Sequence, residues 1–153
     1  MNEDFLDMLR ALARHDVRHL VVGAHALAVH GVPRSTGDID IWIDPSPGNA
    51  SRAWAALVEF GAPVAALGVS ARDLQAPDLV VQIGLPPRRI DLLTSLTGIE
   101  FAEAWDRRAL FPVDDLDVPF LDRESLLVNK RAAGRPKDLA DVAALEGEGG
   151  PLR

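Results

Sequence analysis

The sequence predicts a mixed α/β fold, in which short strands alternate with helices along the chain. Segment 38–43, Asp-Ile-Asp-Ile-Trp-Ile, alternates polar and apolar residues with the period of two that a strand requires. Short apolar runs at 20–22, 79–83, 89–93 and 118–121 predict further strands. Segments with helical spacing lie between them, and this order of elements is typical of α/β domains.

Helix start and stop residues bound four expected helices in the first part of the chain. Asn2 caps a first helix, whose apolar residues recur at helical spacing. An alanine-rich second helix is expected over 24–30, and a third over 51–60 that ends at Gly61. A fourth helix is expected over 101–107.

The C-terminal part predicts two consecutive helices. Asp122 caps a helix that runs through Ala133 and ends at Gly134, and Pro136 fits the first turn of the next helix. The apolar face of this last helix is expected to comprise Leu139, Val142, Ala143 and Leu145.

The connecting segments are less regular. Segment 62–77 predicts only one helical turn, at 70–73, and segment 84–87 joins two of the strands as a hairpin. Asp114, Asp115 and Asp117 are expected in a solvated turn.

Length indicates one domain. The chain has 153 residues, of which 48% are hydrophobic and 25% are charged, and a single domain usually has ~100–200 residues. We expect one domain over residues 1–146 and a flexible tail over 147–153.

Charge and composition exclude several classes of function. The 23 acidic and 16 basic residues give a net charge of −7, which argues against general DNA binding because such binding needs clustered positive charge. The chain contains no cysteine, which excludes disulfides, thiolate metal sites and a cysteine nucleophile. The acidic N-terminus and the lack of a run of ~18–20 apolar residues predict a cytoplasmic protein without a membrane segment.

Two aspartates share one face of the strand at 38–43. Residues two apart in a strand point to the same side, ~6.6 Å from each other, so Asp38 and Asp40 project together. Neighbouring carboxylates repel unless a cation compensates them, and oxygen ligands suit Mg²⁺ or Mn²⁺. The alternative is a pair of aspartates that face solvent at a strand end.

Residues around this pair favour a phosphate ligand. Gly23 lies between a strand and a helix N-terminus, where free backbone N–H groups attract anions. Arg34, Ser35 and Thr36 follow before the aspartate pair, and Asp91 supplies a third acidic group from another strand. Three carboxylates beside such a turn predict metal-assisted phosphoryl chemistry.

These residues carry a resemblance to a known family. The string from Val22 to Ile43, VGAHALAVHGVPRSTGDIDIWI, resembles the nucleotidyltransferase superfamily related to DNA polymerase β, whose mark is Gly-Gly or Gly-Ser followed by Asp-x-Asp or Asp-x-Glu. RIDLL around Asp91 is similar to the strand with that superfamily's third carboxylate. Segment 121–145 is similar to the C-terminal helices of small bacterial members, including abortive-infection toxins.

The resemblance implies a fold with a short mixed sheet, helices packed mainly on one side and two C-terminal helices. It implies a transferase that moves a nucleoside monophosphate from a triphosphate such as ATP to a hydroxyl of RNA, protein or a small molecule. Asp38, Asp40 and Asp91 would hold Mg²⁺ or Mn²⁺ and act in catalysis. The implied nucleotide contacts are Gly23, Ala24, Arg34, Ser35, Thr36, Lys130 and Lys137.

A toxin–antitoxin or phage-defence role, with a cognate partner protein, extends this resemblance. The chain departs from the pattern at Ala24, which lacks the hydroxyl that a serine would offer the phosphates. A catalytically weak nucleotide-binding or antitoxin-like module and a metal-dependent phosphohydrolase are the alternatives.

Further residues have two interpretations each. Lys130, Arg131, Arg135 and Lys137 are either a solvated helix face or contacts to phosphate or the acceptor. Arg89 either pairs with Asp91, on the same strand face, or reaches phosphate. His25 and His30 are too widely spaced for a zinc pair and are expected to pack, with His30 close to the site through its turn.

Overall fold

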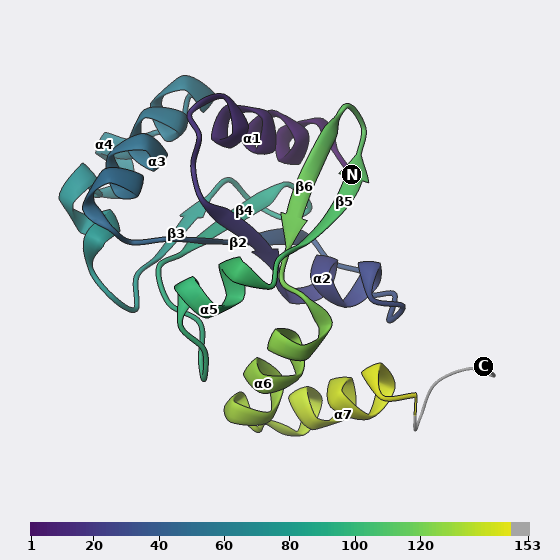
Figure 1. The fold of residues 1–153 in the computed structure, drawn as a ribbon. Helices are drawn as coiled ribbons and strands as arrows, with labels where there is room; N and C mark the ends of the chain where they lie inside the picture. The colour runs from purple at the N-terminus through teal and green to yellow at the C-terminus, as the bar shows by residue number, and fades with distance from the viewer. Residues whose placement is uncertain (148–153) are drawn as a thin grey trace.

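The computed structural model describes residues 1–147 and contains a six-stranded sheet with the order β3-β4-β2-β1-β6-β5 (Figure 1). The strands are β1 (His19–Val22), β2 (Asp38–Ile43), β3 (Val80–Ile83), β4 (Arg89–Leu93), β5 (Ala109–Val113) and β6 (Leu116–Phe120). β2–β4 and β1–β6 are parallel pairs and the other pairs are antiparallel. The predicted mixed α/β fold is therefore confirmed.

The alternation in β2 separates a buried apolar face from the carboxylate face. Ile39, Ile41 and Ile43 have no exposed surface, whereas Asp38 and Asp40 are only partly buried. Residues two apart in a strand lie on one face, so the sheet itself keeps the aspartates out of the isoleucine layer. The boundaries of this strand agree with the sequence prediction.

Helices α1 (Glu3–Arg14) and α3 (Pro47–Phe60) lie together on one side of the sheet (Figure 1). The Asn2 side chain accepts a hydrogen bond from the Phe5 N–H group, which confirms the predicted cap. α3 begins earlier than the predicted residue 51, because Ser46 and Pro47 supply a cap position and a first turn.

Further helices lie on the opposite side of the sheet in Figure 1. They are α2 (Gly23–Val29), α5 (Phe101–Asp106), α6 (Arg123–Ala133) and α7 (Pro136–Leu145). α6 and α7 pack against each other, and the Asp122 side chain caps α6 by accepting from the Ser125 N–H group. The two predicted C-terminal helices are confirmed. Leu139 is 51% exposed, so the prediction that it belongs to the buried face was wrong.

Segment 62–77 contains more structure than one predicted turn. α4 (Val64–Leu67) precedes the short 3₁₀ helix η1 (Ala71–Gln75), and Ser70 and Asp73 form a capping box. None of the helices in residues 1–147 has the length and apolar composition that a membrane crossing requires. The tail predicted for 147–153 lies outside the described residues, apart from Gly147.

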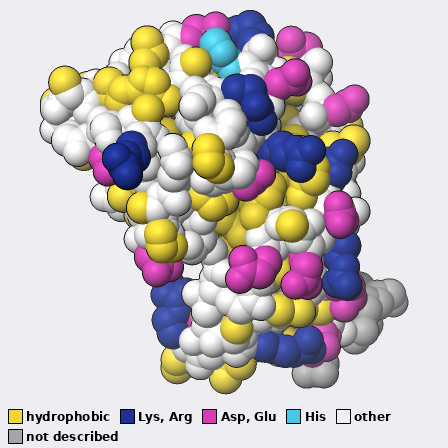
Figure 2. All heavy atoms as spheres, turned by 60° about the vertical axis from the view of Figure 1, so that its left-hand side comes forward, with side chains coloured by type: hydrophobic (Ala, Val, Ile, Leu, Met, Phe, Trp, Pro, Cys, Tyr) yellow, Lys and Arg dark blue, Asp and Glu magenta, His cyan; other side chains and the backbone are white. Residues whose placement is uncertain are grey.

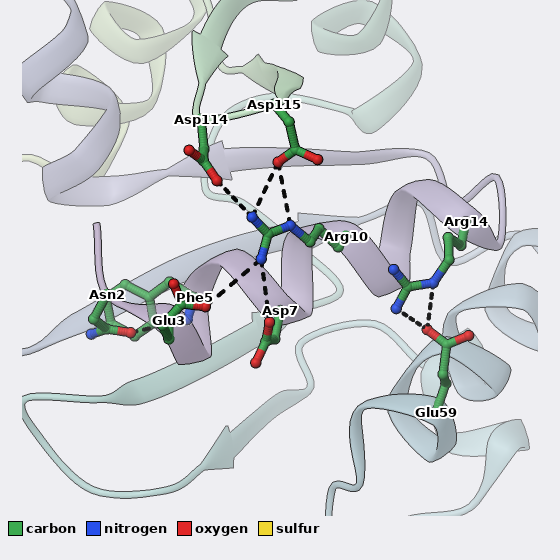
Figure 3. Close-up of polar contacts among 9 residues, drawn as sticks. All are labelled: Asn2, Glu3, Phe5, Asp7, Arg10, Arg14, Glu59, Asp114 and Asp115. Carbon is green, nitrogen blue, oxygen red and sulfur yellow. Dashed lines mark hydrogen bonds and ion pairs between the residues drawn. The ribbon is translucent and has the colours of Figure 1, made fainter.

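The aspartates at the turn between β5 and β6 do more than face solvent. Arg10 Nη2 lies 2.6 Å from Asp114 Oδ2 and 3.1 Å from Asp115 Oδ1, so this turn is tied to α1 (Figure 3). Arg14 likewise pairs with Glu59 and links α1 to α3. Asp114 and Asp115 are exposed in this turn, as predicted, and their ion-pair partner Arg10 comes from a distant helix.

Charges of both signs are interspersed on the face drawn in Figure 2. Lys and Arg side chains lie beside Asp and Glu side chains there and do not merge into one basic surface. This distribution agrees with the net charge of −7. Positive charge that serves a ligand on this chain must therefore be local.

Candidate active site

The register of the parallel pair β2–β4 brings the three predicted carboxylates together. Asp38 lies opposite Arg89, and Asp40 lies opposite Asp91. Arg89 Nη2 is 2.5 Å from Asp38 Oδ2, and Arg89 Nε is 3.0 Å from Asp91 Oδ1. The predicted ion pair with Asp91 is confirmed, and the same guanidinium also holds Asp38.

Asp40 is the carboxylate of the cluster that Arg89 does not pair with. Burial, together with the negative charges of Asp38 and Asp91, raises the pKa of Asp40 to about 7, against a smaller lowering effect from Arg89. One guanidinium therefore balances three carboxylates only in part. The cluster favours either a proton or an additional cation at Asp40.

Gly23 leaves the space that the Asp40 side chain occupies. Its φ of +67° is in the left-handed region, and a Cβ atom there would lie 2.3 Å from Asp40 Oδ2. Real Cβ atoms do not approach an oxygen so closely, so any side chain at this position would displace the carboxylate. This close approach accounts for the glycine that the sequence places at the start of α2.

We predict that Gly23→Ala destabilises the protein by about 1–3 kcal/mol more than Gly31→Ala, because overpacking at Asp40 adds to the backbone cost. Gly31 is the matched control: its φ is +99°, and a Cβ there would meet nothing within 4 Å. Urea unfolding of both variants measures the difference. Equal losses would contradict the proposed contact with Asp40.

A cleft of about 590 Å³ opens beside the aspartates, between the start of α2, the loop that precedes β2, and the α6–α7 pair. Most of the predicted site residues line it, namely Gly23, Ala24, Arg34, Ser35, Thr36, Asp38, Asp40, Lys130, Arg135 and Lys137. The structure thus gathers residues that are distant in the sequence around one cavity.

Three of the predicted residues do not line this cleft. Asp91 and Arg89 lie next to the cleft aspartates on β4, and Asp91 is only 6% exposed. His30 turns elsewhere: its Nε2 atom is 2.8 Å from the Leu121 carbonyl oxygen, and its ring packs edge-on against Phe111. The structure therefore gives His30 a packing role rather than a place at the site.

Thr36 is a partner of Asp38 in this structure. Its hydroxyl donates to Asp38 Oδ1 at 2.9 Å, and its oxygen accepts from the Asp38 N–H group at 3.2 Å. These bonds fix the rotamer of Asp38 at the start of β2. Ser35 and Ala24 border the cavity without such a contact to the carboxylates.

The C-terminal helices contribute a buried ionic network that sequence reasoning missed. Asp138 and Asp141 are 0% and 3% exposed. Lys130 Nζ lies 3.4 Å from Asp138 Oδ1 and 3.1 Å from Asp141 Oδ2. Arg135 pairs with Asp138, and Arg34 pairs with Asp141. The spacing of the two aspartates along α7 was the only sequence signal that they share a side of the helix.

The four predicted cations of the C-terminal helices differ in their contacts and in whether they line the cleft. Arg131 pairs with Glu146, is exposed and does not line the cleft, so the interpretation as a solvated face holds for this residue. Lys130 and Arg135 line the cleft but are ion-paired. Among the described residues, Lys137 is the cleft cation without an ion pair or a side-chain hydrogen bond, which leaves its ammonium group available to a ligand.

We predict that Lys130→Met lowers the free energy of unfolding by roughly 2–3 kcal/mol, because two buried carboxylates lose a shared cation. Lys137→Met should change this free energy by less than about 0.5 kcal/mol, since Lys137 is exposed. Urea unfolding at neutral pH compares the two. A small effect of Lys130→Met would show that Arg34 and Arg135 alone stabilise the network.

The donor atoms at the sheet fit a hard divalent cation in their chemistry. Asp38 and Asp40 present oxygen atoms to the cleft, and Asp91 Oδ1 is buried without a well-aligned hydrogen bond in the described part of the chain. The side chains of residues 1–147 do not, however, form a ready three-ligand metal group as they stand. Arg89 lies between Asp38 and Asp91, so a divalent ion would have to compete with its guanidinium.

We predict that Asp40→Asn stabilises the metal-free protein at pH 8 but not at pH 4. The folded pKa of about 7 lies above the ordinary 3.8, so the protonated form favours folding, and this contribution is lost as pH rises from about 4 to about 7. The asparagine variant does not lose it. Urea unfolding should show a gain of on the order of 1–3 kcal/mol at pH 8, whereas an equal difference at both pH values would contradict the raised pKa.

Comparison with known proteins identifies the fold. No family model matches the chain, and a search of curated proteins gives no match. Among solved structures, a protein of Thermotoga maritima that is named as a candidate nucleotidyltransferase aligns with a TM-score of 0.59. The alignment covers 94% of this chain and 88% of that one, at 14% sequence identity. At this identity the likeness concerns the fold, and the chain has a nucleotidyltransferase fold.

Proposed function

We propose that the protein is a Mg²⁺- or Mn²⁺-dependent nucleotidyltransferase that moves a nucleoside monophosphate from a triphosphate to an acceptor hydroxyl. The observation that carries the proposal is that Asp38 and Asp40 line a cleft whose other walls supply cations, with Asp91 directly beside them on β4. Carboxylates and cations in one cleft match the two parts of a metal–triphosphate complex. The likeness of the fold to a candidate nucleotidyltransferase supports the same activity class.

Asp38 and Asp40 would hold the divalent ion, together with Asp91 once Arg89 moves aside. When bound, the ion supplies charge neutralisation on the phosphate oxygens that carry negative charge in the transition state. Thr36 orients the Asp38 carboxylate, and Gly23 leaves room for that of Asp40. These contacts prearrange the oxygens, so less reorganisation is needed when the substrate binds.

The basic residues of the cleft bind the triphosphate in this scheme. Lys137 has no protein partner for its ammonium group in the described residues and lines the cleft, so it is the first contact we assign. Arg34 and Lys130 face the same cleft from their bonds with Asp141, and can share their positive charge with a phosphate without leaving this carboxylate. Ala24 offers its backbone N–H group but no hydroxyl.

The experiment incubates the protein with each α-labelled triphosphate, Mg²⁺ or Mn²⁺, and acceptors of three kinds: RNA, cell-lysate protein and small molecules. We expect label transfer that falls about 10³-fold or more in Asp40→Asn, because loss of a metal-holding carboxylate costs several kcal/mol at ~1.4 kcal/mol per tenfold. Lys137→Met should mainly raise KM. Equal transfer by wild type and Asp40→Asn, or transfer by neither with any metal and acceptor, would contradict the proposal.

A nucleotide-binding module without transfer is the second candidate. Ala24 in place of glycine or serine and the occupation of Asp38 and Asp91 by Arg89 favour it. Such a module would be stabilised against heat by a triphosphate with Mg²⁺, and no labelled product would form. Release of phosphate or pyrophosphate without an acceptor product would instead indicate the phosphohydrolase. A toxin–antitoxin or defence role rests on the sequence resemblance of segment 121–145 alone.

A further inference from the structure

A second cavity, of about 380 Å³, adjoins the carboxylate cleft. Leu96 lines both cavities and separates them. The volume of the second cavity falls in the range of ~300–1,000 Å³ that is typical of small-molecule sites. The residues that line it with a polar or aromatic group are Trp42, Gln75, Asp78, Thr94, Ser95, Glu100 and Phe101.

The strands that carry the carboxylates lead directly to this second cavity. Trp42 follows Asp40 by two positions in β2, so it lies on the same face of the sheet, ~6.6 Å further along the strand. Ser95 comes shortly after β4, the strand that carries Asp91. A molecule seated here would therefore lie beside the site where the α-phosphate is expected.

The two cavities differ in the sign of their charge. The carboxylate cleft has four basic lining residues, whereas the charged residues that line the second cavity are Asp78 and Glu100, both acidic. Neither of these carboxylates has an ion pair or a hydrogen bond with the described residues. A phosphate group in the second cavity would meet two negative charges and no compensating cation.

Two of the residues that line the cavity have a donor without a hydrogen-bond acceptor among the described residues. The indole Nε1 atom of Trp42 is buried and makes no hydrogen bond with any described residue. The Ser95 oxygen accepts from the Asp78 N–H group at 2.9 Å, and the Ser95 hydroxyl hydrogen remains available. The Trp42 and Phe101 rings pack edge to face, with 5.0 Å between their centroids, and form the apolar floor of the cavity. Buried unpaired donors of this kind favour a ligand with hydroxyl or other oxygen acceptors.

We propose that the second cavity binds the acceptor, and that this acceptor is a small hydroxylated molecule with a protonated amine rather than an RNA end. The inference rests on the proposed function. In the reaction, the acceptor hydroxyl oxygen forms a bond to the α-phosphorus while the bond from this phosphorus to the β-bridging oxygen breaks. Pyrophosphate leaves, and the hydroxyl proton passes to solvent. The amine lies against Asp78 and Glu100, and the apolar part of the molecule lies on the Trp42–Phe101 floor.

The first experiment measures binding without triphosphate or metal, so that only the second cavity is tested. Glucosamine, glucose and glucose 6-phosphate share one scaffold and carry positive, zero and negative charge at a pH of about 6. Calorimetric or saturation-transfer titration should give the highest affinity for glucosamine, a lower affinity for glucose and the lowest for glucose 6-phosphate. The double variant Asp78→Asn/Glu100→Gln should weaken glucosamine about five- to tenfold and leave glucose within about twofold, as expected for a partly exposed ion pair.

Several outcomes would overturn this inference. They are equal or stronger binding of glucose 6-phosphate, no binding of any of the three sugars, and an unchanged glucosamine affinity in the double variant. The double variant Glu103→Gln/Asp117→Asn is the matched control because it removes the same charge at exposed residues that line neither cavity, and it should bind glucosamine as wild type does. A loss of folding in Asp78→Asn/Glu100→Gln is checked by its unfolding transition. The single variant Glu100→Gln, at an exposed position, then replaces it.

The second experiment separates this inference from the proposed function. Wild type is given α-labelled triphosphate, Mn²⁺, and an equimolar mixture of glucosamine and an RNA oligonucleotide. Label on the sugar supports both the proposed transfer activity and the small-molecule acceptor. Label on the RNA alone leaves the proposed function standing and overturns the small-molecule acceptor. Selective glucosamine binding without label on any acceptor overturns both the transfer activity and the acceptor role of the cavity.

Discussion

The register between β2 and β4 is the constraint on which the rest of the site depends. It sets Asp40 beside Asp91 and Asp38 beside Arg89, so one guanidinium pairs with two of the three carboxylates and not with Asp40. The isoleucines on the opposite face of β2 are fully buried and hold the strand in this register, because a shift by one residue would turn them to the carboxylate side. The stability of the core and the excess negative charge of the site are therefore linked.

The excess charge explains the surroundings of the cluster. Gly23 gives Asp40 room at the start of α2, Thr36 orients Asp38, and the C-terminal helices bring cations to the opposite wall of the cleft. The α6–α7 pair is held there through buried carboxylates, with Arg34 reaching Asp141 from the loop before β2. The same network thus fixes a wall of the cleft and presents its positive charge.

Sequence patterns predicted the elements whose signals are local. The alternation in β2, the Asn2 and Asp122 caps and the stop at Gly134 were sufficient for their elements. β5 was missed because Pro112 weakens its strand pattern, although its antiparallel pairing with β6 is a local hairpin. The burial of Asp138 was also missed, because its ion pair with Lys130 joins residues eight positions apart on two helices. The carboxylates were identified because their spacing on a strand has direct chemical meaning.

In the proposed mechanism, the carboxylate cluster binds a divalent cation in place of the contacts that Arg89 makes now. This binding is measured by titration of Mn²⁺ followed by electron paramagnetic resonance at pH 8, where Asp40 is ionised in the metal-free protein. We expect wild type to remove the signal of free Mn²⁺ and Asp40→Asn not to remove it. Equal binding by both proteins, or by neither, would contradict this mechanism.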